Sequence, residues 1–304
     1  MKIVAKSGCK LEQLEDRYNK GFRFFEIQLD KEFVDETFSL ANYNHIMSNR
    51  WDIQSIHMPI VPDGEEFNLE YLGDSKYSMI LFNVCKVAQA CADFYKHPII
   101  IVIHDGIPIK SLIKMPDTLN KIVSIFEIIF KYYPSVIFSI ENITSFVIKN
   151  KTVKFRQNCF TENVEIAQYL NKKLDTNRFG TTLDICHILM TQLSMQFISD
   201  YPKWEDTKRD LEYYIAENKN TINNVHLNNM REIGIQKMNH GASFDKDNPS
   251  DMLILDNFFD LYQKYEYSCN VTLEVDEISY LDAINAKRLK DLIEERYLIV
   301  QKDR

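Results

Sequence analysis

Six residues that can bind a divalent metal recur at the ends of short apolar segments. They are His57, His104, Glu141, Asp184, His226 and Glu274, in IQSIHM, IIIVIHDG, VIFSIEN, TTLDIC, NNVHLNN and VTLEV. A carboxylate or imidazole in such a segment is costly unless it is paired, because burial removes its hydration. A single shared partner would satisfy all six side chains, and a metal ion is the simplest partner of that kind.

The intervals between these six residues are nearly regular, at 47, 37, 43, 42 and 48 residues. Each interval is about the length of one strand, one helix and the two loops that connect them. A fold that repeats this unit and turns the C-terminal end of every strand to one face would gather all six side chains. The (β/α)8 barrel is such a fold, and its active sites lie at that face. The sequence therefore predicts an α/β protein with a TIM barrel.

The segments that must position these residues alternate between two patterns. Strand-like runs, mostly continuous apolar or β-branched as in parallel strands buried on both faces, cover 2–5, 23–29, 53–58, 98–104, 135–142, 179–186, 222–228 and 270–275. Helical stripes cover 78–95, 119–133, 161–174, 204–219 and 250–265. Ser250, after Pro249, is predicted to cap the last of them. The segments 59–77, 143–160, 188–203 and 229–249 are expected to be loops. We predict one domain over 1–304, with a charged helical extension at about 282–304.

Composition limits the classes of partner. The 304 residues, 45% of them hydrophobic, suffice for one barrel of roughly 250 residues with extensions. A net charge of −8 gives no global positive field, so nucleic acid is not an expected partner. The six cysteines lack CxxC spacing, which indicates reduced thiols. Without a signal-like or membrane-spanning apolar run, we expect a cytoplasmic protein with no membrane partner. A homo-oligomer is left open.

Three further side chains are predicted to contact substrate. His187 lies three residues after Asp184, where it either binds an ion or donates a hydrogen bond to substrate. His240 lies in the turn MNHGASF, and Glu26 lies in the strand-like RFFEIQL. A solvent-exposed role is the alternative for His240, and pairing with a basic side chain such as Arg23 is the alternative for Glu26.

The main residues also have structural interpretations. A lone His226 would be a satisfied core histidine, and Asp184 would cap a helix that follows its strand. His57 and His104, assigned to a second ion site, would otherwise bind substrate or support the core without metal. Cys186 is more simply a small buried thiol than a thiolate ligand.

The main ligand set, Glu141, Asp184, His226 and Glu274, offers carboxylate oxygens and one imidazole. Such ligands suit zinc, manganese, iron or cobalt, and we favour zinc or manganese. The chain has neither GxGxxG nor GxxxxGK[ST], so no nucleotide-phosphate loop is indicated.

The order of the short motifs HxP, HDG, EN, DxxH, HLN, H-G and LE resembles the superfamily of xylose isomerase-like TIM barrels. That superfamily includes sugar isomerases, sugar epimerases and endonuclease IV, and the resemblance spans Phe22 to Val275. The likeness to the epimerases implies one divalent ion held by Glu141, Asp184, His226 and Glu274. It also implies that the two glutamates move the proton on the carbon beside a carbonyl.

The endonuclease IV branch implies three zinc ions and a larger ligand set: His57, His104, Glu141, Asp184, His187, His226, His240 and Glu274. Where that branch has an aspartate two residues before the last histidine, this chain has Met238, and a thioether does not replace a carboxylate. The glycine-rich segment after the strand-5 glutamate is also absent. We therefore predict a metal-dependent isomerase or epimerase of a sugar or sugar phosphate. The alternatives are an endonuclease IV-like zinc phosphodiesterase acting on abasic DNA and a metal-binding barrel without activity.

Overall fold

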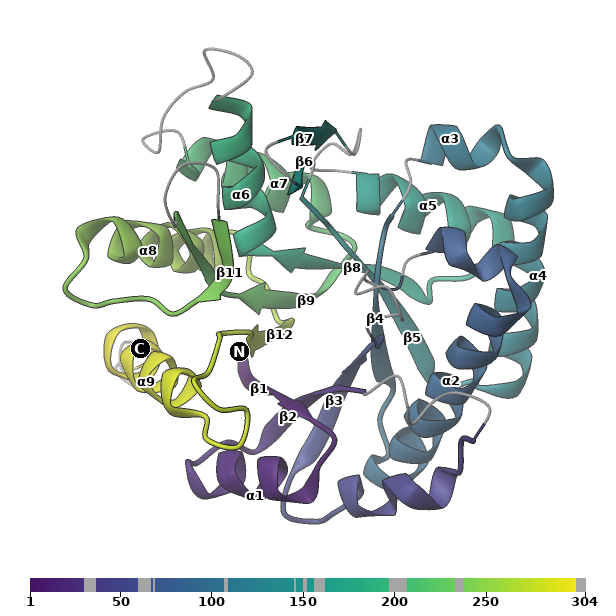
Figure 1. Ribbon diagram of the computed structural model, residues 1–304, viewed down its shortest axis with the longest axis horizontal. Coiled ribbons are helices and arrows are strands. Elements are labelled where there is room, and N and C mark those ends of the chain that lie inside the picture. Colours follow the sequence, from purple (N-terminus) through teal and green to yellow (C-terminus); the bar gives the residue numbers. More distant parts are fainter. Residues whose placement is uncertain are drawn as a thin grey trace.

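Eight parallel strands close into a barrel surrounded by helices (Figure 1). The computed structural model describes residues 1–29, 37–59, 67, 69–106, 109–144, 146–149, 152–155, 162–196, 207–232 and 238–298. The barrel strands are β1 (Lys2–Gly8), β2 (Phe24–Gln28), β3 (Asp52–His57), β4 (Ile99–His104), β5 (Val136–Glu141), β8 (Phe179–Asp184), β9 (Ile222–Leu227) and β12 (Asn270–Leu273). They follow the order β1-β12-β9-β8-β5-β4-β3-β2 around the barrel. The predicted TIM barrel is confirmed, and each predicted strand overlaps an observed one.

Helices cover the outside of the barrel (Figure 1). The longer ones are α1 (Leu11–Asn19), α2 (Ser75–Tyr95), α4 (Pro116–Tyr132), α5 (Glu162–Leu174), α6 (Ile185–Gln196), α7 (Thr207–Asn218), α8 (Pro249–Lys264) and α9 (Ile284–Ile293). Short ones are η2 (Leu40–Ile46), η3 (Leu69–Gly73), α3 (Ile109–Ile113) and η5 (Glu294–Leu298). Among the described residues, no helix is both long enough and apolar enough to cross a membrane.

The cap predicted for α8 was wrong by two residues. Asn248 is the N-cap, and its side chain accepts a hydrogen bond from the backbone N–H of Ser250 at 3.0 Å. Pro249 takes the first helical position, where its missing N–H costs nothing. Ser250 is therefore already inside the helix.

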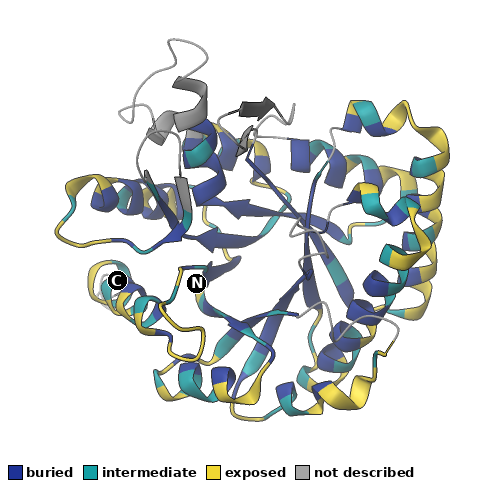
Figure 2. Ribbon diagram, in the orientation of Figure 1, coloured by how far each residue is buried: buried dark blue, intermediate teal, exposed yellow. Residues whose placement is uncertain are grey.

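The barrel strands are buried, and the outer faces of the helices carry most of the exposed residues (Figure 2). An aromatic cluster joins α4 to the wall of the barrel. The ring of Phe126 lies 4.9 Å from that of Phe138 in β5 and 4.8 Å from that of Phe179 in β8, both edge-to-face. Contacts of this kind fix the helix layer against the strands, so that the strand ends stay in place.

The segments that the sequence predicted to be loops hold regular structure, so these predictions were partly wrong. Segment 59–77 contains η3 and the start of α2, and 188–203 contains α6 as far as Gln196, because the chain passes from β8 directly into a helix. Two hairpins occur in the other two segments. The first pairs β6 (Phe146–Lys149) with β7 (Thr152–Phe155), and the second pairs β10 (Asn229–Glu232) with β11 (Met238–Ala242). The second hairpin follows the C-terminal end of β9 and carries His240 in β11. His240 is thus held by strand pairing rather than by a turn. The side chain of Met238 lies outside the described residues.

The C-terminal extension packs beside α8. Helix α9 buries Ala286, Leu289 and Ile293, and the Tyr297 ring stacks on Phe259 of α8 at 4.0 Å. Residues 299–304 of the predicted extension lie outside the described residues.

Candidate metal-binding active site

The C-terminal ends of four strands bring the main predicted ligands together. Glu141 and Asp184 end β5 and β8, His226 lies one residue before the end of β9, and Glu274 follows β12. One ligand atom from each lies within 4.8 Å of the others. The Nδ1 atom of His226 is 3.1 Å from Glu141 Oε1, 3.8 Å from Asp184 Oδ2 and 2.7 Å from Glu274 Oε2. We call these four residues the main ligand group.

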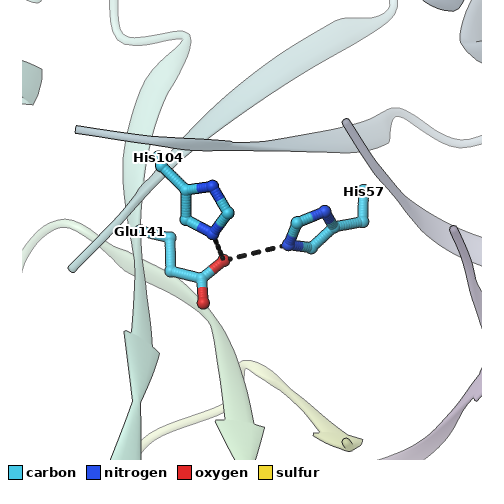
Figure 3. Close-up of side chains that lie close together, drawn as sticks. All are labelled: His57, His104 and Glu141. Carbon is cyan, nitrogen blue, oxygen red and sulfur yellow. Dashed lines mark hydrogen bonds and ion pairs between the residues drawn. The ribbon is translucent and has the colours of Figure 1, made fainter. Parts of the chain in front are cut away.

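A second group adjoins the first and shares one carboxylate with it. His57 and His104 point their Nε2 atoms at Glu141 Oε2, at 3.2 and 3.5 Å (Figure 3). The other oxygen of Glu141 faces His226. Glu141 would therefore contribute one oxygen to each ligand group if both groups held an ion.

The imidazoles are oriented as metal-binding histidines usually are. The Nδ1 atom of His57 lies 2.9 Å from the carbonyl of Met58, which can only accept a hydrogen bond, so Nδ1 carries the proton. In the neutral ring, the lone pair of Nε2 then faces Glu141 Oε2. His226 similarly donates from Nε2 to Glu26, at 3.0 Å from its Oε1, and turns Nδ1 to the main ligand group. A carbonyl or carboxylate behind each ring is the usual support of a histidine ligand.

The charge balance of the site fits a divalent cation. Four buried or nearly buried carboxylates gather there: Glu26, Glu141, Asp184 and Glu274. Among the described residues, Lys6 is the ammonium that contacts them, pairing with Glu274 and lying 3.8 Å from Glu26 Oε1. Glu274 Oε2 is buried and accepts no hydrogen bond from the described residues, although His226 Nδ1 is close. Carboxylate oxygens and an imidazole nitrogen that converge in this way are the ligands that a divalent ion would bind.

The carboxylates are held in the ionised form that ion binding requires. Burial alone would raise the pKa of Glu141, but His226 and His104 hold that pKa well below its usual range. Burial is likewise outweighed at Glu274, whose pKa is lowered by Lys6 and His226. The same carboxylates raise the pKa of His226 well above its usual value, against the effect of burial.

Glu26 lies beneath the main ligand group rather than in the lining of the cavity above it. Its carboxylate is fully buried and accepts hydrogen bonds from Ser55 Oγ at 2.7 Å and Asn224 Nδ2 at 3.1 Å, besides that from His226. Glu26 does pair with a basic side chain, but this is Lys6 at 3.8 Å. Arg23 was the wrong partner, because its guanidinium donates to backbone carbonyls instead. Burial alone would raise the pKa of Glu26, but the charge of His226 outweighs this effect and lowers the pKa to about 2. This position favours support of His226 over contact with substrate.

Asp184 combines the two interpretations that its sequence left open. Its Oδ1 accepts the backbone N–H of His187 at 2.7 Å, which caps the first turn of α6. Its Oδ2 faces the site, 3.4 Å from His240 Nε2, and accepts a hydrogen bond from Asn228 at 2.9 Å. One carboxylate therefore both begins the helix and belongs to the main ligand group.

Cys186 lies near Asp184 and His240, and these three form a third group whose ligand atoms are within 4.8 Å of one another. The strand predicted to include Cys186 ends at Asp184, so Cys186 is in the first turn of α6 instead. Burial raises the pKa of its thiol well above the usual value. This environment favours the neutral thiol that the sequence suggested.

A cavity of about 200 Å³ opens above the ligand groups. Its lining comprises Lys6, Gln28, His57, Met58, Pro59, His104, Glu141, His187, His240, Glu274 and Tyr280. The four histidines predicted to reach an ion or substrate thus line one space with Glu141 and Glu274. His187 is held there by its Nδ1, which donates to the carbonyl of Asn142 at 2.7 Å.

Lys6 and Asn228 are contacts of the site that the sequence reasoning missed. Lys6 stands in the strand KIVAKSG, and it is the same kind of anomaly as the carboxylates: a charge inside a buried strand. That signal was available. Asn228, which binds Asp184, carries no comparable signal, because asparagine after a strand is common in turns.

No family model and no curated protein matches this chain. Solved structures do match. A D-tagatose 3-epimerase-like protein aligns with a TM-score of 0.58 and 16% identity, over 100% of this chain and 99% of the other. An AP endonuclease, family 2, from Brucella melitensis aligns with a TM-score of 0.56 and 12% identity, over 97% and 98%. These likenesses agree with the (β/α)8 barrel fold of the chain.

A third match is a sugar phosphate isomerase/epimerase from Parabacteroides distasonis, with a TM-score of 0.51, 14% identity, and 97% and 95% of the two chains covered. Matches at identities this low establish the fold, and the chemistry of this barrel has to be argued from its own site.

Proposed function

We propose that the protein is a metal-dependent isomerase or epimerase of a sugar or sugar phosphate. The observation that carries this proposal is the double placement of Glu141 and Glu274. Both belong to the main ligand group, and both line the cavity that would hold a substrate.

The residues of the site suit proton transfer beside a carbonyl. A divalent ion held by the main ligand group would supply a Lewis acid for the carbonyl oxygen. Glu141 and Glu274 come from β5 and β12, which are separated in the barrel by β8 and β9. The carbon beside the carbonyl would therefore lie between two carboxylates, one taking a proton and the other returning it. His57, His104, His187 and His240 would contact the hydroxyl groups.

The comparisons lend support of a general kind. The similar structures are described as sugar epimerases and isomerases, an endonuclease and, in one case, a mannonate dehydratase. The cavity is also smaller than the roughly 300–1,000 Å³ common for ligand sites, which favours a small substrate.

Exchange of substrate hydrogen in deuterated water tests the proposal. The metal-loaded protein is incubated with ketoses and ketose phosphates, and NMR follows exchange at the carbons beside the carbonyl. Glu141→Gln and Glu274→Gln should each lower exchange by about 10²–10⁴-fold, the usual contribution of a general acid or base. Glu162→Gln, a buried glutamate of α5, is the matched control and should retain wild-type exchange. Exchange that survives both substitutions would refute the assignment of the pair.

A second candidate, a zinc-dependent phosphodiesterase acting on abasic DNA, is favoured by one specific contact. Glu141 Oε2 faces both His57 and His104, and Oε1 faces His226, so each oxygen is already engaged. This arrangement suits a bridging ligand better than a free base. Two ions so bridged can clamp the attacking and leaving oxygens of a displacement.

Metal analysis and an incision assay separate the two candidates. The isomerase requires one catalytic ion per chain, and the phosphodiesterase requires two or three. Metal-dependent incision of an abasic duplex without hydrogen exchange would establish the second candidate in place of the first. Ion binding without turnover in either assay would favour a barrel without activity.

A further inference from the structure

We propose that Lys6 recognises a phosphate group, and that the substrate of this site is therefore a phosphorylated sugar moiety. The proposal rests on the proposed function, since it names the substrate class of the same site. The sugar phosphate could be free or part of a nucleic-acid backbone, and these two sources share the chemistry that Lys6 would recognise.

Lys6 is a fixed cation at the mouth of the barrel. It lies near the C-terminal end of β1, and its side chain is 8% exposed. Its ammonium pairs with Glu274, lies 3.8 Å from Glu26 Oε1 and lines the cavity. An ammonium has three donors, so the Glu274 pair leaves donor capacity for a ligand.

Ion binding would change the charges around Lys6. The four carboxylates of the site exceed the single ammonium by three charges when the imidazoles are neutral. One divalent ion would leave one net negative charge, and two would leave one net positive charge. In either case, Glu274 would share its charge with an ion. Lys6 would then lose part of its counter-charge, and with two ions bound an anionic group of the substrate would balance the remaining positive charge.

The rest of the described lining adds no acidic side chain to the two that belong to the ligand groups. Among the described residues that line the cavity, Glu141 and Glu274 are the acidic ones, and both belong to the main ligand group. The remaining ionisable lining residues are Lys6, Tyr280 and the four histidines. Lys6 in β1 and His240 in β11 approach the cavity from separate segments. A tetrahedral phosphate accepts hydrogen bonds from several directions, whereas a carboxylate accepts them mainly in one plane.

Ligand affinity, measured by calorimetry at saturating ion, tests this proposal without any turnover. The ligands are a panel of ketoses, their terminal monophosphates, the matching sugar acids and inorganic phosphate. The wild-type protein should bind the monophosphates at least about tenfold tighter than the unphosphorylated ketoses. Lys6→Met should remove most of that preference, and Lys6→Arg should keep it. Lys287→Met, on the exposed face of α9, is the matched control and should behave as wild type.

Several outcomes would overturn the proposal. Equal affinity for phosphorylated and unphosphorylated ligands would do so, as would a stronger preference for sugar acids. A phosphate preference that survives in folded, ion-saturated Lys6→Met would assign it to the ion instead. If Lys6→Met does not fold, Lys6→Gln provides the same comparison.

A further arm identifies the source of the phosphate. An oligonucleotide duplex with a tetrahydrofuran abasic-site analogue is compared with the free monophosphates. Tight, Lys6-dependent binding of the duplex would place the phosphate in a nucleic-acid backbone, and binding of the free monophosphates alone would place it on a metabolite. Both outcomes support recognition of phosphate by Lys6. Absence of hydrogen exchange alone would refute the proposed isomerase and leave this binding result standing.

Discussion

Replacing Glu26 by glutamine should weaken ion binding at the main ligand group, although Glu26 is not one of its ligands. The Glu26 carboxylate accepts hydrogen bonds from His226 Nε2, Ser55 Oγ and Asn224 Nδ2. A glutamine keeps the shape but replaces one accepting oxygen with a donating NH₂ group. Where that group faces His226, the ring must move its proton to Nδ1, and Nδ1 is the atom turned toward the other ligands.

The magnitude follows from the role of such supporting contacts. Groups that hold a metal-binding histidine typically contribute about 10–100-fold in affinity, or roughly 1.4–2.8 kcal/mol. Stability should fall as well. Because the folded-state pKa of Glu26 is lowered from 4.5 to about 2, its charge contributes about 3 kcal/mol to the ion-free protein. That contribution is complete above about pH 4.5 and is lost as the pH falls through about 2. The variant should therefore lose less stability than the wild type over that range.

The assay is a zinc or manganese titration against a competing chelating dye, with circular dichroism to establish the fold. Glu162→Gln is the control, because Glu162 is also a buried glutamate but lies outside the ligand groups. An affinity within twofold of wild type in folded Glu26→Gln would refute the supporting role. A raised KM with unchanged ion affinity would instead restore the substrate contact that the sequence suggested.

Three further predictions concern the ion. Saturating zinc or manganese should raise the melting temperature of the wild type, since a ligand at 100 times its Kd stabilises the folded state by about 2.7 kcal/mol. A calorimetric scan with and without chelator measures the shift. An unchanged melting temperature would contradict an ion site. Ion affinity should fall as the pH is lowered, because the carboxylates raise the pKa of His226 and binding must displace its proton. Titrations in buffers of different ionisation enthalpy should show proton release, and uptake without release would count against His226 as a ligand. Cys186→Ser should leave the ion content unchanged, because burial raises the pKa of the thiol. Loss of ion in that variant, by elemental analysis, would make Cys186 a ligand.

The sequence by itself determined the barrel fold and the four residues of the main ligand group. Buried parallel strands need continuous apolar runs, and a charged residue at the end of such a run stands out from them. That signal identified Glu141, Asp184, His226 and Glu274, which the fold brings within 4.8 Å of one another. It did not identify the pairing in 229–249, where the hairpin of β10 and β11 has no alternating apolar pattern to predict it.

Only the tertiary structure decided which polar residues face the cavity and which lie behind them as supporting contacts. Register along the strands sets this difference. Gln28 pairs with His57 across β2 and β3, whereas Glu26 pairs with Ser55, one step deeper in the barrel. The two positions differ by two residues, so both side chains point to the same side of the strand, and the sequence pattern is the same for both. Depth in a closed barrel depends on how neighbouring strands are staggered, and that stagger is a property of the assembled sheet rather than of any one segment.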